Sequence, residues 1–300
     1  MTNHKHLRAV IEDVYSNDNM LTQDLLLKLI NEFRYSSLLI PAKRENGTLN
    51  FIIYEDAEGK ITPLFTDMDE FRKFFTGDDI RALENPFEIY QNVIKTTDIE
   101  GYILNPASEK YLFSKEFILG ITNLPKTSFF CENPYSGSEL KEILDSLDNQ
   151  SLENFMADMR NAGHYEGLFE ELSHSTVLAL MISPDDLSKI AENGIISMKQ
   201  TGPLAQMHVD RIGGEYATIF TSTEKAKKVT TNHFRYSQIV NIATLVNFVL
   251  AEDMDGIIIN PESDNVLIPR SELLRYSIGF ERFADNPQLC ESIFYMFPLD

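Results

Sequence analysis

The sequence predicts an α+β fold made of two related domains in tandem, each a small mixed β-sheet flanked by helices. Two observations lead to this prediction. A pattern of apolar strand, Asn-Pro turn and second apolar run occurs twice, and residues with helical periodicity surround each copy. The first copy reads GYILNPAS from Gly101 and the second reads GIIINPES from Gly256, so the copies are 155 residues apart.

Each copy is predicted to be a buried strand that stops at the Asn-Pro pair. The runs before Asn105 and Asn260 are short, apolar and free of polar residues, as in strands buried on both faces. Proline has no amide donor and favours extended geometry in the residue before it, so each asparagine should end its strand and begin a turn. A second strand follows each turn, and helices should begin near Ser114 and Arg270.

Two helices are expected before the first strand. Thr22 stands at the N-cap position of a helix that should reach Tyr35. A short amphipathic leader helix is expected within residues 1–21. Its apolar face consists of Leu7, Val10, Ile11 and Val14.

Strands and a hairpin should follow these helices. A strand over residues 37–40 should end at Pro41, because proline interrupts strand pairing. A turn at residues 58–60 should join strands at 51–54 and 61–65 into a hairpin.

A threonine followed by an acid three residues later occurs in both halves before a helical pattern. Thr66 precedes Asp69, and Thr221 precedes Glu224 at the same offset of 155 residues. This spacing resembles a capping box, in which the threonine caps the helix that follows. Residues 87–95 and 242–250 are expected to form a second pair of equivalent helices.

The length of 300 residues and the duplication together predict two domains. A cluster of proline, asparagine, serine and glycine after Leu124 marks the linker. The expected segments are a leader helix at 1–21, a first domain at 22–124, a linker with connecting helices at 125–163, a second domain at 164–277, and an aromatic carboxyl-terminal tail at 278–300 that should dock on the body or on a partner.

Composition excludes several classes of function. Hydrophobic residues make up 43% and charged residues 24% of the chain, which is ordinary for a soluble globular protein. The formal net charge of −20 argues against binding to nucleic acid or anionic membranes, since both depend on clustered lysine and arginine. The acidity fits either solubility in a crowded cytoplasm or recognition of a protein partner with a basic surface.

Two cysteines, Cys131 and Cys290, are too few for a disulfide framework and predict a reducing, cytoplasmic compartment. No signal peptide follows the amino terminus, and the longest apolar runs fall short of the ~20 residues of a membrane span. Nucleophilic catalysis would need Cys131 or a serine paired with a histidine, and neither pairing has a sequence signature. The histidines lack zinc-site spacing, and the glycines form no phosphate loop.

The Asn-Pro turns are the candidate ligand- or partner-binding sites. An asparagine at a strand end can bond the backbone of its own turn or contact a ligand, and both readings stay open. The acid-x-acid-glycine runs that end at Gly101 and Gly256 suit turn chemistry better than Ca²⁺ or Mg²⁺, which need about six oxygen ligands. No catalytic residue, metal or cofactor is therefore assigned. The candidate residues are Asn105, Pro106 and Ser108 in the first copy and Asn260, Pro261 and Ser263 in the second.

The run Phe65-Thr66 before a capped helix, together with the Asn-Pro turn, resembles the SseB protein N-terminal domain family, known for the enhanced serine sensitivity protein of bacteria. The resemblance covers two tandem copies, at about 22–120 and 165–276. It implies a small α+β domain of cytoplasmic prokaryotic proteins with no established enzymatic activity or cofactor. Ala107 and Glu262 depart from the pattern, because the family often has glycine after Asn-Pro.

Three hypotheses of function follow. The first is a non-enzymatic cytoplasmic adaptor or regulator that binds a protein partner. The second is a sensor of an amino acid or related metabolite, held beside the Asn-Pro turns or between the domains. The third is a hydrolase that uses Cys131 or a bound metal. The sequence leaves the oligomeric state open.

Overall fold

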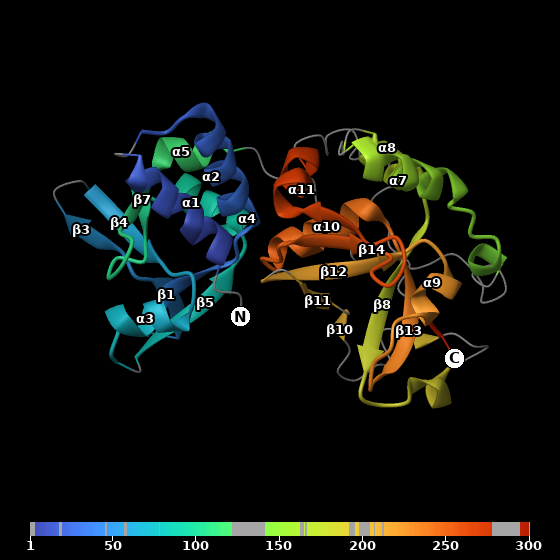
Figure 1. Ribbon diagram of the computed structural model, residues 1–300. Helices are drawn as coiled ribbons and strands as arrows, with labels where there is room; N and C mark the ends of the chain where they lie inside the picture. Colours follow the sequence, from blue (N-terminus) through green and yellow to red (C-terminus); the bar gives the residue numbers. More distant parts are fainter. Residues whose placement is uncertain are drawn as a thin grey trace. The chain divides into compact units, whose positions relative to one another are not determined.

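The computed structural model describes residues 4–17, 20–45, 47–56, 59–77, 79–121, 142–162, 165, 167–191, 196–197, 205–206, 208–211, 213–277 and 295–299 (Figure 1). The fold is α+β, as the sequence predicts. The chain divides into two compact units. Unit 1 comprises Met1–Leu124 with Ala251–Asp253, and unit 2 comprises Pro125–Leu250 with Met254–Asp300. No helix among the described residues is long and apolar enough to cross a membrane.

Unit 1 combines helices with two short sheets. One sheet has the strand order β2-β1-β5, and the other has the order β3-β4-β6-β7. All neighbours pair antiparallel except β4 and β6, which are parallel. A single bridge between Leu39 and Phe65 joins the two sheets. The elements are α1 (Lys5–Ser16), α2 (Gln23–Tyr35), β1 (Leu38–Glu45), β2 (Thr48–Phe51), β3 (Tyr54–Asp56), β4 (Gly59–Leu64), α3 (Met68–Phe74), β5 (Ile80–Asn85), α4 (Phe87–Thr96), β6 (Gly101–Leu104), β7 (Tyr111–Ser114) and α5 (Lys115–Gly120).

Apolar side chains cover both faces of the unit 1 sheets. Successive residues of a strand point to opposite faces, so Leu38 and Ile40 of β1 enter one core cluster while Leu39 enters another. The first cluster includes the buried face of α1, which is Leu7, Val10, Ile11 and Val14 as the periodicity predicts, so the leader helix belongs to the core of unit 1. We call the second cluster the aromatic face; it consists of Leu39, Phe65, Phe71 and Phe75.

The described residues of unit 2 form a nine-stranded sheet. Its main path is β15-β14-β12-β8-β13-β16-β9, with β10 paired to β8 and β11 paired to β12. The elements are α7 (Gln150–Ala162), α8 (Leu168–His174), β8 (Val177–Ser183), the 3-10 helix η1 (Leu187–Ile190), β9 (Ile196–Ser197), β10 (Ala205–Gln206), β11 (His208–Arg211), β12 (Gly214–Phe220), α9 (Thr223–Lys227), β13 (Phe234–Val240), α10 (Ile242–Ala251), β14 (Gly256–Ile259), β15 (Val266–Pro269), α11 (Arg270–Ser277) and β16 (Tyr295–Pro298).

The two units repeat the same strand register. In unit 1 the parallel pair runs from Ile61 opposite Gly101 to Leu64 opposite Leu104. In unit 2 it runs from Tyr216 opposite Gly256 to Ile219 opposite Ile259, again at an offset of 155 residues. Helices α4 and α10 begin at the same offset, as do α5 and α11. The sequence repeat is therefore a structural repeat.

Three predictions about local structure are wrong. The expected strand at 51–54 is interrupted, because β2 ends at Phe51 and β3 begins at Tyr54. Strand β1 continues through Pro41 to Glu45, and the carbonyl of Pro41 accepts a hydrogen bond from the Ile52 amide at 3.0 Å. The amide and carbonyl of a strand residue point to the same side, so the missing amide of Pro41 faces Ile52, just beyond the end of the β2 ladder, and the pairing with β5 does not need it. The threonines also do not cap α3 and α9, because Asp67 and Ser222 do so, each accepting hydrogen bonds from the first turn of its helix.

Part of the carboxyl-terminal tail docks on the sheet of unit 2. Strand β16 pairs antiparallel with β13 on one side and with β9 on the other. Residues 278–294 and Asp300 lie outside the described residues, as do 122–141 of the predicted linker, which include Cys131. The later part of that segment forms α7, which packs beside α8 in unit 2 (Figure 1).

The glycines that begin the two parallel strands should resist substitution. A Cβ atom on Gly101 would lie 2.7 Å from the Phe113 carbonyl oxygen, and one on Gly256 would lie 2.2 Å from that of Ile268. Because backbone must move to relieve either clash, Gly101→Ala and Gly256→Ala should each lower the free energy of unfolding by about 1–3 kcal/mol. Gly120→Ala is the matched control, since no atom lies within 4 Å of its Cβ position. Chemical denaturation measures all three, and equal stabilities would contradict the prediction.

Candidate functional site: two Asn-Pro turns and their charge networks

Both Asn-Pro asparagines are buried and bond a threonine just beyond the end of the neighbouring strand. The Asn105 side-chain oxygen accepts a hydrogen bond from the Thr66 amide at 3.1 Å, and its nitrogen donates to the Thr66 hydroxyl at 3.0 Å. Asn260 makes the same two bonds to Thr221, both at 3.0 Å. We call this arrangement the asparagine clasp. It fastens the end of the second parallel strand to the chain that leaves the first.

The backbone around each clasp is a tight turn with the asparagine in the left-handed region. The φ angle is 43° at Asn105 and 51° at Asn260. Asparagine tolerates this conformation better than most residues, which explains its presence at this position. The Asn105 carbonyl accepts hydrogen bonds from the Ser108 and Lys110 amides at 2.8 and 3.2 Å, and the same two bonds recur at Asn260.

The six candidate residues therefore have different environments. The amide groups of Asn105 and Asn260 are engaged with their own chain, so a ligand could reach them only by breaking the clasp. Pro261 is buried and Pro106 is partly buried. Ser108 and Ser263 are exposed, and the Ser108 hydroxyl donates to the Glu70 carboxylate at 2.5 Å. This geometry favours the structural reading of the turns over ligand contact.

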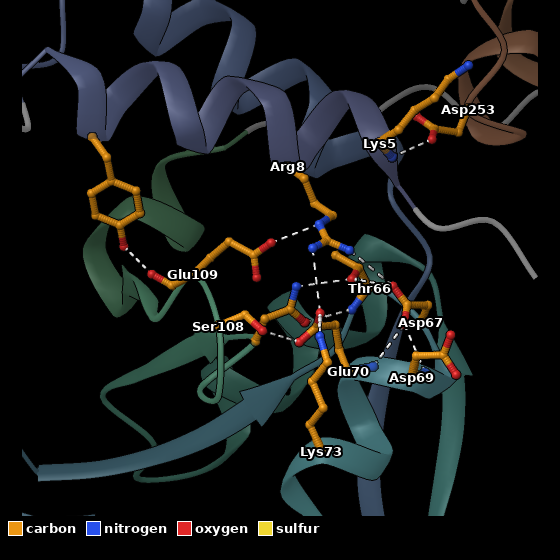
Figure 2. A network of polar contacts seen from close by, with 12 residues as sticks. Lys5, Arg8, Thr66, Asp67, Asp69, Glu70, Lys73, Ser108, Glu109 and Asp253 are labelled. Atoms are coloured by element: carbon orange, nitrogen blue, oxygen red, sulfur yellow. Dashed lines mark hydrogen bonds and ion pairs between the residues drawn. The ribbon is translucent and has the colours of Figure 1, made fainter.

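A network of charged side chains surrounds the clasp of unit 1 (Figure 2). Arg8 reaches from α1 to three carboxylates: its Nε lies 2.8 Å from Glu109, and its two terminal nitrogens lie 3.5 Å from Asp67 and Glu70. The Glu70 side chain is only 2% exposed and also binds Lys73 at 2.5 Å. The network thus ties α1, α3 and the Asn-Pro turn together.

The pKa values in this network reflect its pairing. Burial alone would raise the pKa of the Glu70 carboxyl, but hydrogen bonds from Lys73 and Ser108 and the charges of Lys73 and Arg8 outweigh burial and hold that pKa below its ordinary value. The folded state therefore favours the ionised carboxylate. Its contribution to stability is present above the ordinary pKa and is lost as the pH falls through the lowered one.

Unit 2 builds an equivalent network in which one pair of charges is exchanged and the acid of the turn is kept. Glu153 of α7 takes the place of Arg8, and Lys225, at the position of Glu70, lies 2.6 Å from Glu153 and 2.7 Å from Asp264. Asp264 corresponds to Glu109 at the offset of 155 residues. Burial would lower the pKa of the Lys225 ammonium, but its two carboxylate partners raise it overall. A helix is therefore fastened to the turn in both units, by opposite arrangements of charge.

Sequence reasoning found the turns but missed both networks. Arg8 and Glu153 precede their turns by about a hundred residues, and no spacing rule connects them. Among the described residues, no group of three or more histidine, cysteine, aspartate or glutamate side chains could hold a metal ion. Cys131, Cys290 and His164 lie outside the described residues. The networks position helices, and the carboxylates that accept from the Ser108 and Thr221 hydroxyls are each also paired with a lysine.

Comparison with known proteins found no matching family model, no similar curated protein and no similar solved structure.

The clasp should contribute strongly to the stability of unit 1. Asn105→Ala removes both bonds to Thr66, leaves a buried amide unpaired and places alanine in the left-handed region, so we expect a loss of about 2–4 kcal/mol. Asn105→Gly should lose less, because glycine adopts this φ without strain. Lys110→Asn is the control: Lys110 is exposed with φ 55°, and unit 2 has Asn265 there, so stability should stay equal or rise slightly. Calorimetry of the three variants measures the differences, and a neutral Asn105→Ala would refute the clasp.

The reversed charges predict a rescue. Arg8→Glu should bring a carboxylate to Glu70 and Glu109, and Glu70→Lys should bring a cation to Arg8 and Lys73, so each variant should be less stable. Together they reproduce the Glu153 and Lys225 arrangement of unit 2, so the double variant should recover about 1–2 kcal/mol relative to the sum of the single losses. A double-mutant cycle of unfolding free energies measures this coupling. Strictly additive losses would show that the two positions are independent.

Proposed function

We propose that this chain is a non-enzymatic adaptor or regulatory protein and that unit 1 carries the surface for a protein partner. The supporting observation is an apolar surface at the margin of the aromatic face. Tyr54 and Phe74 are 38% and 37% exposed, and Ile53, which precedes Tyr54 in the chain, is 42% exposed. The rings of Tyr54 and Phe74 lie 5.8 Å apart, and Phe74 also contacts buried Phe65. Exposed apolar side chains that cluster together often mark a protein interaction site, whereas isolated ones do not.

The equivalent surface of unit 2 is covered by its own chain. Val229 occupies the position of Phe74 at the offset of 155 residues, and it is 3% exposed. Leu299 belongs to the same core cluster, and Ile143, Leu144 and Leu147 pack against it. Within the part of the chain that the structure describes, no such segment covers Ile53 and Phe74. The comparison of the two units thus supports the proposal that a partner protein covers this surface of unit 1.

The charge of the chain indicates the kind of partner. A net charge of −20 attracts a basic surface and raises the rate of association with it, and added salt screens this attraction. The two cysteines and the composition fit a cytoplasmic setting for this interaction. The resemblance to SseB domains, which implies no enzymatic activity, agrees with the proposal.

Partner capture tests the proposal. The tagged chain should retain a stoichiometric partner from native lysate at low salt and lose it as salt rises. Ile53→Lys should weaken capture at least tenfold, because it places a charged group on the apolar surface and repels a basic partner. A preparation that retains no protein at low salt would contradict the proposal.

A matched variant controls for surface charge. Leu27→Lys adds the same charge on α2 at a side chain that is 45% exposed, close to the 42% of Ile53. Capture by this variant should equal capture by the unmodified chain. Equal weakening by both variants would show that charge alone, and not the surface around Ile53, governs binding.

A further inference from the structure

Strands β5 and β13 are equivalent, yet only β13 has neighbours on both sides. Leu38 opposite Asn85 in unit 1 corresponds to Val177 opposite Val240 in unit 2, so both strands pair in the same register with their inner neighbour. Strand β13 then pairs with β16 on its outer side. Among the described residues, β5 pairs with β1 alone. Accordingly, most of β13 is buried, whereas no residue of β5 is fully buried.

The pairing of β16 identifies the backbone groups that β5 leaves open. The Arg235 carbonyl accepts a hydrogen bond from the Leu299 amide at 3.2 Å, so the backbone of Arg235 faces β16. Outward-facing residues alternate along a strand, which places Ser237 on the same side. At the offset of 155 residues these positions are Ile80 and Ala82 of β5. Their outward amide and carbonyl groups can pair with an added strand.

The side chains of β5 specify what the added strand would carry. Phe297 of β16 lies opposite Ser237, and the equivalent Ala82 is equally small and packs against the aromatic face. An aromatic residue opposite Ala82 would therefore extend that cluster. Two residues further along the same face, Glu84 is exposed and lies opposite the position of Tyr295 in such a strand. A lysine or arginine there would pair with Glu84.

Among the described residues, no strand of this chain is available as the occupant. Strand β16 of this chain is paired on both sides, so using it at β5 would break two existing ladders. A second copy of the chain is disfavoured because each copy carries a net charge of −20. A segment with a basic residue complements both Glu84 and the chain as a whole.

We propose that the outer edge of β5 binds an extended segment of a partner protein as an added antiparallel strand. The segment has the pattern basic-x-aromatic-x-apolar, with the basic residue opposite Glu84, the aromatic residue opposite Ala82 and the apolar residue opposite Ile80. This inference rests on the proposed protein-binding function and assigns the partner's mode of recognition.

A synthetic peptide tests this mode directly. The probe is the sequence of residues 293–299 with lysine in place of tyrosine at 295, labelled for fluorescence anisotropy and titrated with the full chain. Saturable binding is expected. Ala82→Pro removes one outward amide while the β1 ladder remains, so it should weaken binding at least tenfold. A peptide methylated on the backbone nitrogen of the phenylalanine at position 297, which would face Ala82, should lose binding similarly, and this arm leaves the protein unaltered.

Exchanging the charges of Glu84 and the facing peptide residue tests the register in which the peptide pairs with β5. Glu84→Lys should weaken binding of the lysine peptide about fivefold or more, and a peptide with glutamate at that position should recover affinity for this variant only. Glu88→Lys, at a partly exposed position of α4 outside the edge, is the charge control and should not distinguish the two peptides.

The outcomes separate this inference from the proposed function. Absence of saturable binding, or equal binding by the chain, Ala82→Pro and the methylated peptide, would overturn strand addition at β5. Partner capture that remains sensitive to Ile53→Lys but not to Ala82→Pro would also overturn it while leaving the proposed function standing. Loss of all capture at low salt would count against both.

Discussion

The asparagine clasp is the interaction on which the rest of each unit depends. Two strands that run parallel are joined by a crossover, here β5 with α4 or β13 with α10, and the crossover closes only if the strand ends meet in register. Asn105 and Asn260 hold those ends by satisfying a buried threonine amide that has no ladder partner. The clasp fixes how the two strand ends meet. The clasp, the register of the parallel strands and the helices that follow them all recur at the offset of 155 residues.

The charge networks show how the same attachment tolerates opposite chemistry. Arg8 among carboxylates and Lys225 between Glu153 and Asp264 both join a preceding helix to the turn. Reversing one partner requires reversing the other, since a like-charge pair near a buried site would be costly. What recurs is an ion pair between the preceding helix and the helix after the first parallel strand, Arg8 with Glu70 in unit 1 and Glu153 with Lys225 in unit 2, and either polarity provides it.

The differences between the units fall outside the clasp, on the aromatic face and at one sheet edge. In unit 2, the chain supplies Ile143, Leu144, Leu147 and Leu299 to the face and β16 to the edge. In unit 1, the described residues leave Ile53, Tyr54 and Phe74 exposed and β5 paired on one side. Both differences border the same aromatic cluster, because Phe74 contacts its member Phe65 and Ala82 packs against it. One partner could therefore cover the surface and add a strand at the edge.

The sequence by itself determined the α+β class, the repeat, the Asn-Pro strand ends and the buried face of α1, because periodicity and turn chemistry act over a few residues. The sequence did not predict that β1 continues through Pro41, because this depends on how β1 pairs with the strands beside it. It also did not predict that the Thr66 and Thr221 hydroxyls bond a distant asparagine instead of capping a helix. Only the tertiary structure decided the partners of Arg8 and Glu153 and the pairing of β16. Such contacts join segments that are far apart in the sequence, and local sequence patterns do not show which distant segments pack together.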